Sequence, residues 1–234
     1  MIRLVTKERQ WTLLFILPFY FGYGQWLFSF LFMMLGSLFQ WDLNSANIDA
    51  LFNLVYLALL GVVLVCIYRD YLKKSYEKMK GRWLKEITYA CTLGSLKFYV
   101  INIICSMMIM LIHPGGVSAN QEAVSQLALL EPTMMIVSTV ILAPLVEELI
   151  FRVGLFQLFY TKSRTTAYLV SSLAFGFVHI VNGLFAGDFS QILYLLPYGL
   201  LGAVLCRFYE KRDTIFAPMM IHALNNLIGI LIIL

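Results

Sequence analysis

The residues best suited to chemistry are two adjacent carboxylates and an arginine, Glu147, Glu148 and Arg152, which carry the only charges in residues 132–160. A charged side chain at the centre of a bilayer costs about 2.5–3.5 kcal/mol on insertion scales, so this cluster indicates a functional site. On a helix, Glu148 and Arg152 are four residues apart and can pair on one face. Glu147 is turned about 100° away. We expect the pair to orient Glu147 or help hold a substrate, while Glu147 stays available for chemistry.

A second polar side chain, His179, lies in the next apolar stretch. The basic turn at residues 162–164 divides the two stretches, and Glu147 and His179 each lie sixteen residues from Ser163. An antiparallel helical hairpin centred on this turn places both side chains at the same height, roughly 24 Å along each helix at 1.5 Å per residue. A histidine in a membrane helix is usually a packing residue, but level with an unpaired glutamate it is a candidate acid–base partner.

The third polar position is His222 with Asn226, which are four residues apart and share a face of the last apolar stretch. Pro218 suits the first turn of that helix. His222 then lies near a helix N-terminus, whose partial positive charge favours a neutral imidazole and stabilises an oxyanion. Asn226 lies fourteen residues after Arg212, near the depth of the other two positions. Hydrogen bonding between helices is the alternative role for an asparagine here.

A carboxylate, two histidines and an asparagine at one depth suit the activation of water. Glu147, with His179 beside it, would remove a proton from water for attack on a peptide carbonyl. His222 and Asn226 would then hydrogen-bond the oxyanion that forms. The same groups could instead bind zinc as a His/His/Glu site with an open position, although the sequence has no HExxH motif. We favour a glutamate-activated water without a cofactor and keep zinc as the alternative.

The elements that must position these residues are membrane helices. The chain is 61% hydrophobic and 13% charged, whereas soluble domains have about 25% charged residues. A helix needs about 20 apolar residues to cross a bilayer. Stretches of about that length occur at residues 11–39, 50–68, 87–112, 132–160, 166–183, 190–208 and 214–234. We therefore predict an all-α, polytopic membrane bundle of about seven transmembrane helices, in a cell membrane.

Charge is divided between alternate connections of this bundle. Apart from Lys97 and Arg152, the lysines and arginines lie at residues 3–9, 69–85, 162–164 and 207–212. The other connections carry only acidic residues, Asp42, Asp49, Glu122, Glu131 and Asp188. By the positive-inside rule, the N-terminus is cytoplasmic and the C-terminus lies outside. The basic run at 73–85 is thus interpreted as a topology signal in a solvated loop. Binding of anionic lipid is the alternative, and nucleic acid is not expected.

Other conspicuous residues have structural explanations. Pro144 removes the hydrogen bond to the Val140 carbonyl, which can kink the helix beside Glu147 and leave space for water. Three glycines, Gly154, Gly176 and Gly183, would let the helices of the hairpin approach closely. Four cysteines without CxxC spacing are expected as buried apolar residues, namely Cys66, Cys91, Cys105 and Cys206.

Three motifs in separate predicted helices contain these polar residues: EExxxR at Glu147, Glu148 and Arg152, FxxxH at Phe175 and His179, and HxxxN at His222 and Asn226. In this order they resemble the motifs of the CAAX protease and bacteriocin-processing enzyme family, also called the Abi or CPBP family. The resemblance covers residues 126–234. We therefore divide the chain into N-terminal transmembrane helices with a basic cytoplasmic loop (1–125) and a protease core (126–234).

The resemblance implies an intramembrane endopeptidase that cleaves membrane-associated peptides or proteins. In the family, the first glutamate and the FxxxH histidine activate water, which here are Glu147 and His179. The last histidine and asparagine, His222 and Asn226, correspond to the oxyanion hole, and no metal is implied. Eukaryotic relatives trim prenylated CAAX termini, whereas bacterial relatives are linked to bacteriocin self-immunity, leader-peptide processing and peptide-signal maturation. A short chain without a soluble domain is more similar to the bacterial kind.

Two other classes of protein explain part of the pattern. A non-catalytic immunity protein that binds a bacteriocin needs the fold but not the acid–base residues. A small proton-coupled transporter needs polar residues through the whole thickness of the membrane, whereas here they concentrate at one level. We expect the lipid bilayer and a membrane-associated peptide as partners. The substrate and the oligomeric state do not follow from the sequence.

Overall fold

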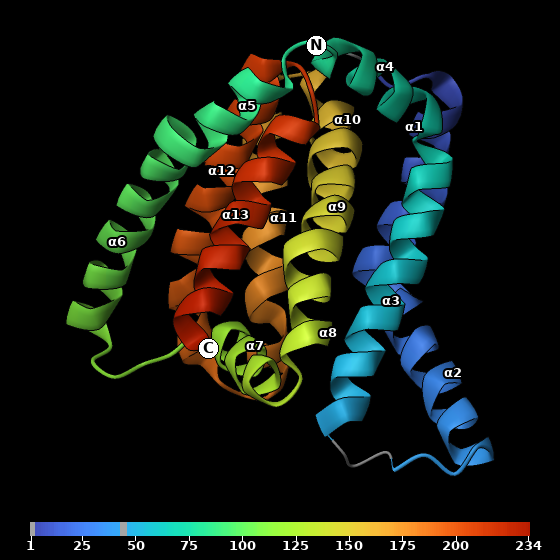
Figure 1. The fold of residues 1–234 in the computed structure, drawn as a ribbon, viewed down its shortest axis with the longest axis vertical. Helices are drawn as coiled ribbons and strands as arrows, with labels where there is room; N and C mark the ends of the chain where they lie inside the picture. The colour runs from blue at the N-terminus through green and yellow to red at the C-terminus, as the bar shows by residue number, and fades with distance from the viewer. Residues whose placement is uncertain (1–2, 43–45) are drawn as a thin grey trace.

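The computed structural model describes residues 3–42 and 46–234, and these residues form an all-helical membrane protein (Figure 1). Seven helical runs in the described residues are long and apolar enough to cross a membrane, which confirms the predicted polytopic fold. They are Thr6–Leu38, Asn47–Ile67, Trp83–Ile112, Pro132–Tyr160, Arg164–Phe185, Phe189–Arg212 and Phe216–Ile233. Their bounds lie within five residues of the predicted ones, because polar flanking residues continue several helices beyond the apolar stretch.

Several spans are built from short α-helices joined end to end. The α-helices are α1 (Thr6–Trp11), α2 (Gly24–Leu38), α3 (Ala46–Ile67), α4 (Arg69–Met79), α5 (Trp83–Tyr89), α6 (Ser95–Ile112), α7 (Ala119–Leu130), α8 (Pro132–Ile136), α9 (Ala143–Glu148), α10 (Gln157–Tyr160), α11 (Arg164–Phe185), α12 (Leu195–Arg212) and α13 (Phe216–Ile233). Wide-turn π-helical segments join them at Thr12–Ile16, Phe19–Tyr23, Ala90–Gly94, Val137–Leu142 and Leu149–Phe156, and a 3₁₀ turn, Phe189–Tyr194, precedes α12. Such wide turns are common at functional sites.

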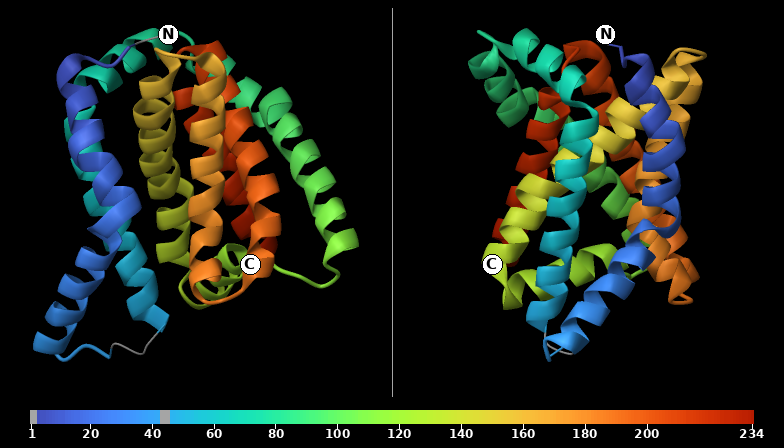
Figure 2. Two further views of the ribbon diagram at one scale, coloured as in Figure 1. Left: turned by 180° about the vertical axis from the view of Figure 1, so that it is seen from behind. Right: turned by 90° about the vertical axis from the view of Figure 1, so that its right-hand side faces the viewer.

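The helices α8 to α13 form the centre of the molecule, with α6 on one side and α2 and α3 on the other (Figures 1 and 2). The helix α4 lies across one end, beside the ends of α10 and α12 and the start of α13 (Figure 1). We call this the basic end, because the connections with lysine and arginine meet there. The helix α7 lies across the opposite end, which we call the α7 end (Figures 1 and 2).

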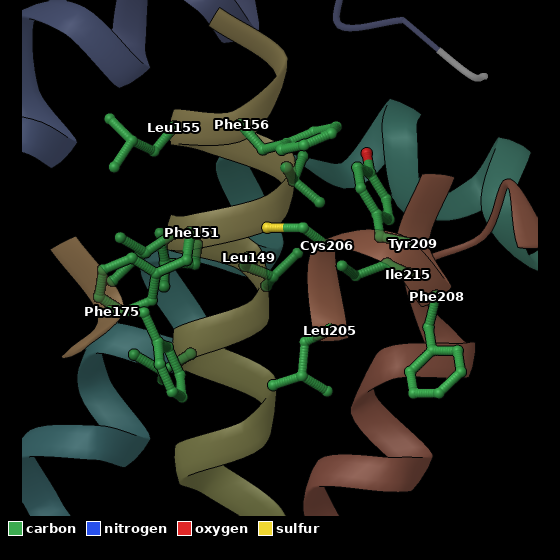
Figure 3. Close-up of a cluster of buried hydrophobic side chains, with 14 of the residues drawn as sticks. Leu149, Phe151, Leu155, Phe156, Phe175, Leu205, Cys206, Phe208, Tyr209 and Ile215 are labelled. Carbon is green, nitrogen blue, oxygen red and sulfur yellow. The ribbon is translucent and has the colours of Figure 1, made fainter. Parts of the chain in front are cut away.

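The main hydrophobic core lies between the middle of the bundle and the basic end. All eight residues of Leu149–Phe156 are buried, including the charged Arg152. Around them pack apolar side chains from α11, α12 and the start of α13, among them Phe175, Leu205, Cys206, Tyr209 and Ile215 (Figure 3). Full burial of one such side chain stabilises the fold by about 1.5–3 kcal/mol, so this segment anchors the helices that surround it.

Buried polar contacts attach the N-terminal segment to the basic end. The buried Glu8 accepts hydrogen bonds from the amides of Val5, at 2.8 Å, and Tyr71, at 3.0 Å. The hydroxyls of Thr12 and Tyr68 lie 2.7 Å apart. Burial raises the pKa of the Tyr71 hydroxyl, whose hydrogen bond to another hydroxyl keeps its oxygen satisfied. The sequence gives no periodic signal for these contacts, and we did not predict them.

The predicted burial of the cysteines and the predicted close helix contacts at the glycines are each confirmed only in part. Cys105 and Cys206 are buried as predicted, but Cys66 and Cys91 are exposed on the outer faces of their helices, where lipid can cover them; all four are free thiols. A Cβ on any of the three glycines would lie 2.9 Å or less from a neighbouring atom, so close approach is confirmed. The neighbours, however, belong to segments other than the expected hairpin partner, including the start of α12 at Gly176.

Substitution of Gly176 tests this packing. A Cβ there would lie 2.9 Å from the backbone nitrogen of Gly199 and 3.1 Å from the carbonyl oxygen of Leu195, neither of which can rotate away. Gly176→Ala is therefore expected to destabilise the protein by about 1–3 kcal/mol, which lowers the unfolding midpoint by roughly 2–4 °C per kcal/mol. Gly22→Ala, with no atom within 4 Å of the new Cβ, is the matched control. Equal melting of both variants in detergent would contradict the close contact.

Candidate active site

Glu147 lies between two histidines from different helices. Its Oε2 atom is 3.8 Å from Nε2 of His179 on α11 and 3.8 Å from Nε2 of His222 on α13. The prediction that Glu147 and His179 lie at one depth is therefore confirmed. A direct hydrogen bond needs about 2.7–3.2 Å, so these groups do not bond one another, and Oε2 has no hydrogen-bond partner in the described residues. One water can bridge gaps of this size.

The ring of His179 is held in a defined orientation. Its Nδ1 atom lies 2.7 Å from the Phe175 carbonyl oxygen. A carbonyl oxygen only accepts, so we assign the proton to Nδ1, and the neutral ring then turns the lone pair of Nε2 toward Glu147. Tyr198 stacks on the other side of the imidazole, with ring centroids 4.5 Å apart and an interplanar angle of 23°. Both contacts keep Nε2 beside the unpaired carboxylate oxygen.

The second histidine is held by the buried ion pair. Glu148 Oε2 lies 3.1 Å from Arg152 Nε, and both side chains have no exposed surface, as the sequence predicted for this pair. The other oxygen, Glu148 Oε1, accepts a hydrogen bond from His222 Nδ1 at 3.1 Å. The pair thus positions His222, whereas the sequence suggested Glu147 or a substrate.

The helix N-terminus has less influence on His222 than the sequence suggested. The helix α13 begins at Phe216, so Pro218 lies in its first turn as expected and His222 lies in the second. The dipole effect falls off within the first turn. The carboxylate of Glu148, 3.1 Å from Nδ1, is therefore the stronger electrostatic influence on the imidazole.

Asn226 bonds a carbonyl that Pro144 leaves free. The amide of Ala143 donates to the Ser138 carbonyl, five residues back. In this wide-turn register the next bond would join residue 144 to the carbonyl of Thr139, but proline has no N–H. Asn226 Nδ2 donates to this oxygen at 2.7 Å. The freed carbonyl is thus that of Thr139 and not that of Val140, because the helix has the wider register here.

The four residues predicted as catalytic line one cavity of about 250 Å³. Its walls come from α3, α7, α9, α11, α12 and α13 and the segment before α9. The lining includes Glu147, His179, His222, Asn226, Asn53, Asn120, Gln121, Thr139, Tyr198 and Asn225. Glu148 and Arg152 lie behind this wall. The four candidates from the sequence therefore share one cavity, and the structure separates them from the Glu148–Arg152 pair behind its wall.

Tyr198 is a site residue that the sequence analysis missed. Besides its stack on His179, its hydroxyl lies 2.9 Å from Ser118 Oγ and accepts from Asn120 Nδ2 at 3.4 Å. These partners lie about eighty residues earlier in the chain, at the start of α7. No spacing rule links such distant residues. Its place directly after Pro197 in an apolar stretch was the only local signal.

A metal site made from the same side chains would need a tighter arrangement. No group of three or more metal-binding side chains close enough to hold an ion occurs within residues 3–42 and 46–234. Tetrahedral zinc ligands at about 2.0–2.1 Å from the metal lie about 3.3 Å from one another. The separations of Glu147 from His179 and His222 are 3.8 Å. If their side chains moved closer together, Glu147, His179 and His222 would be the residues that hold zinc.

Comparison with known proteins finds one family model that matches the part of the chain containing the site. Residues 129–228 match the family model described as Rce1-like, type II CAAX prenyl endopeptidase Rce1-like. The match covers 100 of the 234 residues, all within the C-terminal half of the chain. The matched residues include the three motifs that suggested this kind of protease, so the resemblance is confirmed. No solved structure matches the chain.

Three relatives agree with this assignment. The chain is 24% identical over 226 residues to UPF0177 protein YvdC of Lactococcus lactis, covering 96% of this chain and 77% of that protein. It is 30% identical over 134 residues to the protein named "Putative membrane peptidase YdiL" of Bacillus subtilis, covering 57% and 46%. It is 36% identical over 89 residues to UPF0177 protein YxdF of Lactococcus lactis, covering 38% and 44%. The chain thus spans under half the length of the last two. Together, the Rce1-like match and the similarity to YdiL support an intramembrane protease of the CAAX type.

Substitution of Arg152 tests the buried ion pair with Glu148. Arg152→Met leaves the Glu148 carboxylate buried without its cation, which is expected to cost about 3–5 kcal/mol. The double variant Glu148→Gln/Arg152→Met removes both charges and should recover much of that loss. Arg207→Met is the control, because Arg207 is half exposed and its ion pair with Glu210 contributes about 0–1 kcal/mol. Unfolding in detergent measures all three; a double variant less stable than Arg152→Met would contradict the pair.

Proposed function

We propose that this protein is an intramembrane endopeptidase that hydrolyses peptide bonds of membrane-associated peptides or proteins with a water activated by Glu147. The observation that carries the proposal is the unpaired Glu147 Oε2, equidistant at 3.8 Å from two imidazole nitrogens in a polar cavity. A water in this gap can donate one hydrogen to the carboxylate and the other to His179 Nε2. Its oxygen lone pairs then remain free to attack a carbonyl carbon.

The reaction divides into attack and collapse. Glu147 takes a proton from water, the hydroxide oxygen bonds to the carbonyl carbon, and the electron pair of the carbonyl moves to its oxygen. This oxyanion accepts hydrogen bonds from Asn226 Nδ2, whose second hydrogen is not used by Thr139, and from Nε2–H of protonated His222. When the tetrahedral intermediate collapses, the C–N bond breaks and the leaving nitrogen takes the proton that Glu147 holds.

The Glu148–Arg152 pair sets the charge available for this step. Its two charges cancel within the core, so Glu147 is the carboxylate among the described lining residues of the cavity that stays available as a base. Glu148 meanwhile accepts from Nδ1 of His222, which orients the ring so that Nε2 lies beside Glu147. The pair therefore acts through His222 and does not touch the substrate in this mechanism.

The biological role is inferred from the resemblance of the motifs to bacterial members of the CAAX protease and bacteriocin-processing enzyme family. We infer that the substrates belong to bacteriocin self-immunity, leader-peptide processing or peptide-signal maturation in a cell membrane. A non-catalytic immunity protein that binds a bacteriocin is the second candidate. It shares the fold but has no use for the unpaired Glu147 carboxylate, so variants of this residue separate the two functions.

Replacement of Glu147 is the direct test of the chemistry. Glu147→Gln keeps the size of the side chain and removes the base, so cleavage in proteoliposomes should fall at least about 100-fold. The readout is new peptide termini detected by mass spectrometry. Glu122→Gln is the matched control, since this exposed carboxylate of α7 does not line the catalytic cavity and should leave the rate unchanged. Wild-type cleavage by Glu147→Gln would reject the mechanism, and protection from a bacteriocin by a variant that cannot cleave would favour the binder.

Metal chelation distinguishes activation of the water by Glu147 alone from activation by a bound zinc ion. If the water is activated by Glu147 alone, 1,10-phenanthroline leaves cleavage unchanged. Loss of cleavage that added zinc restores would instead assign Glu147, His179 and His222 to a metal site.

Tyr198 is expected to position His179 through its ring and not through its hydroxyl. Tyr198→Phe keeps the stack and should keep kcat within about twofold of wild type, whereas Tyr198→Ala should lower kcat about tenfold with little change in KM. A tenfold loss corresponds to about 1.4 kcal/mol, within the range of an aromatic contact. Steady-state kinetics in proteoliposomes measure both variants. Equal losses in Tyr198→Phe and Tyr198→Ala would show that the hydroxyl contacts with α7 matter instead.

A further inference from the structure

The catalytic cavity extends from Glu147 in one direction only. On the span that carries Glu147, the lining residues are Thr139, Ala143 and Glu147 itself, all at or before the carboxylate. On α13 they begin at His222 and continue to Ile233, near the end of the helix. These two spans run in opposite directions, so both sets lead from the site toward the α7 end (Figure 1).

The opposite direction is filled by the hydrophobic core. Every residue of Leu149–Phe156, which follows the two glutamates toward the basic end, is buried. Side chains such as Leu205, Cys206 and Tyr209 fill the space beside this segment (Figure 3). Protein cores have packing densities of about 0.74–0.76. Among the described residues, a peptide coming along this span from the basic end would have to separate the core to reach Glu147.

A second cavity widens the route on the α7 side. It has a volume of about 700 Å³ and lies between α6 from Tyr99 onward, the connection to α7, the start of α12 and the second half of α13. It shares Gln121, Tyr198, Asn225, Gly229 and Ile233 with the catalytic cavity. The end of α6 diverges from α13 on this side (Figures 1 and 2). The two cavities thus adjoin along α13.

The start of α7 forms the polar edge of both cavities. The amide of Ala119 donates to Gln191 Oε1 at 2.9 Å, and Ser118 bonds Tyr198. Asn120 and Gln121, in the first turn of α7, line the catalytic cavity. A polar edge of amide side chains suits the backbone N–H and C=O groups of an extended peptide, which need partners away from water.

The two ends of the bundle differ in charge. Of the 17 lysines and arginines, only Lys97 and Arg152 lie outside the connections of the basic end, and the connections of the α7 end contain neither residue type. The α7 end carries Asp42, Asp49, Glu122, Glu131 and Asp188 instead. The positive-inside rule assigns the basic end to the cytoplasm.

We propose that the substrate reaches Glu147 from the outer, α7 side of the membrane, so that the substrates are peptide segments exposed outside the cytoplasm and not cytoplasmic C-termini. This inference rests on the proposed function and adds the class of substrate. From His222 to Ile233 the wall is eleven residues of helix, or roughly 16 Å at 1.5 Å per residue. An extended chain covers about 3.3 Å per residue. The scissile bond therefore lies about five residues into the bundle from the outer surface.

Cysteine labelling in intact cells tests the access route without any need for cleavage. The exposed Cys66 and Cys91 are replaced by serine, while the buried Cys105 and Cys206 stay in place, and this parental chain measures the background. Single cysteines are then added as Asn225→Cys in the shared wall of the cavities, Gln126→Cys on the exposed face of α7, and Lys162→Cys at the basic end. The probe is a charged, membrane-impermeant maleimide.

The expected result is labelling of Asn225→Cys and Gln126→Cys in intact cells, with Lys162→Cys labelled only after the membrane is permeabilised. Labelling of Asn225→Cys only after permeabilisation, or not at all while Gln126→Cys reacts from outside, would overturn the proposal. The result is independent of catalysis. If Asn225→Cys is labelled from outside but the protein cleaves no peptide, only the proposed protease function is rejected. If the protein cleaves peptides but Asn225→Cys is labelled only after permeabilisation, only the proposed access route is rejected.

Discussion

The structure of the site depends on one fully buried ion pair. Two charges removed from water cost several kcal/mol each unless every available partner is used. Part of this cost is offset by partners on other helices: Glu148 accepts from His222 on α13, and Arg152 donates to the Gly202 carbonyl on α12 at 3.3 Å. The guanidinium also lies 4.5 Å from the ring centroid of Phe175 on α11. The pair thus fixes three helices around the span that carries it, and the cavity forms beside it.

Two adjacent glutamates have different roles because successive residues of a helix differ in direction by about 100°. Glu148 is turned into the core, where Oε1 accepts a hydrogen bond from His222 and Oε2 lies 3.1 Å from Arg152 Nε. Glu147 is turned into a polar cavity, where one oxygen has no partner among the described residues and faces two imidazoles. Identical side chains therefore serve as a structural ion and a candidate base. His222 lies beside both glutamates, so a shift of Glu148 would also change the position of the imidazole next to Glu147.

The parts of this arrangement that follow local rules were predictable from the sequence. Apolar length gave the spans, and the short turn at Ser163 fixed the register of a hairpin, so counting placed Glu147 level with His179. The contact of Glu148 with His222 was not predictable, because it depends on how far α13 rotates about its axis. The wide-turn register before Pro144, which frees the Thr139 carbonyl, and the reach of Tyr198 to α7 also depend on tertiary packing. Residues that meet across eighty positions leave no periodic signal.

The packed core also determines what kind of membrane protein this fold can be. A transporter needs polar groups or water through the whole membrane thickness, and here Leu149–Phe156 fills one side of the site with side chains that are apolar apart from Arg152. A hydrolase needs water on one side only, because its proton returns to the leaving nitrogen and nothing crosses. A polar cavity closed at one end by a dense core supplies water to Glu147 and still keeps the bilayer sealed to ions. The same core that stabilises Arg152 therefore makes intramembrane hydrolysis compatible with an intact membrane.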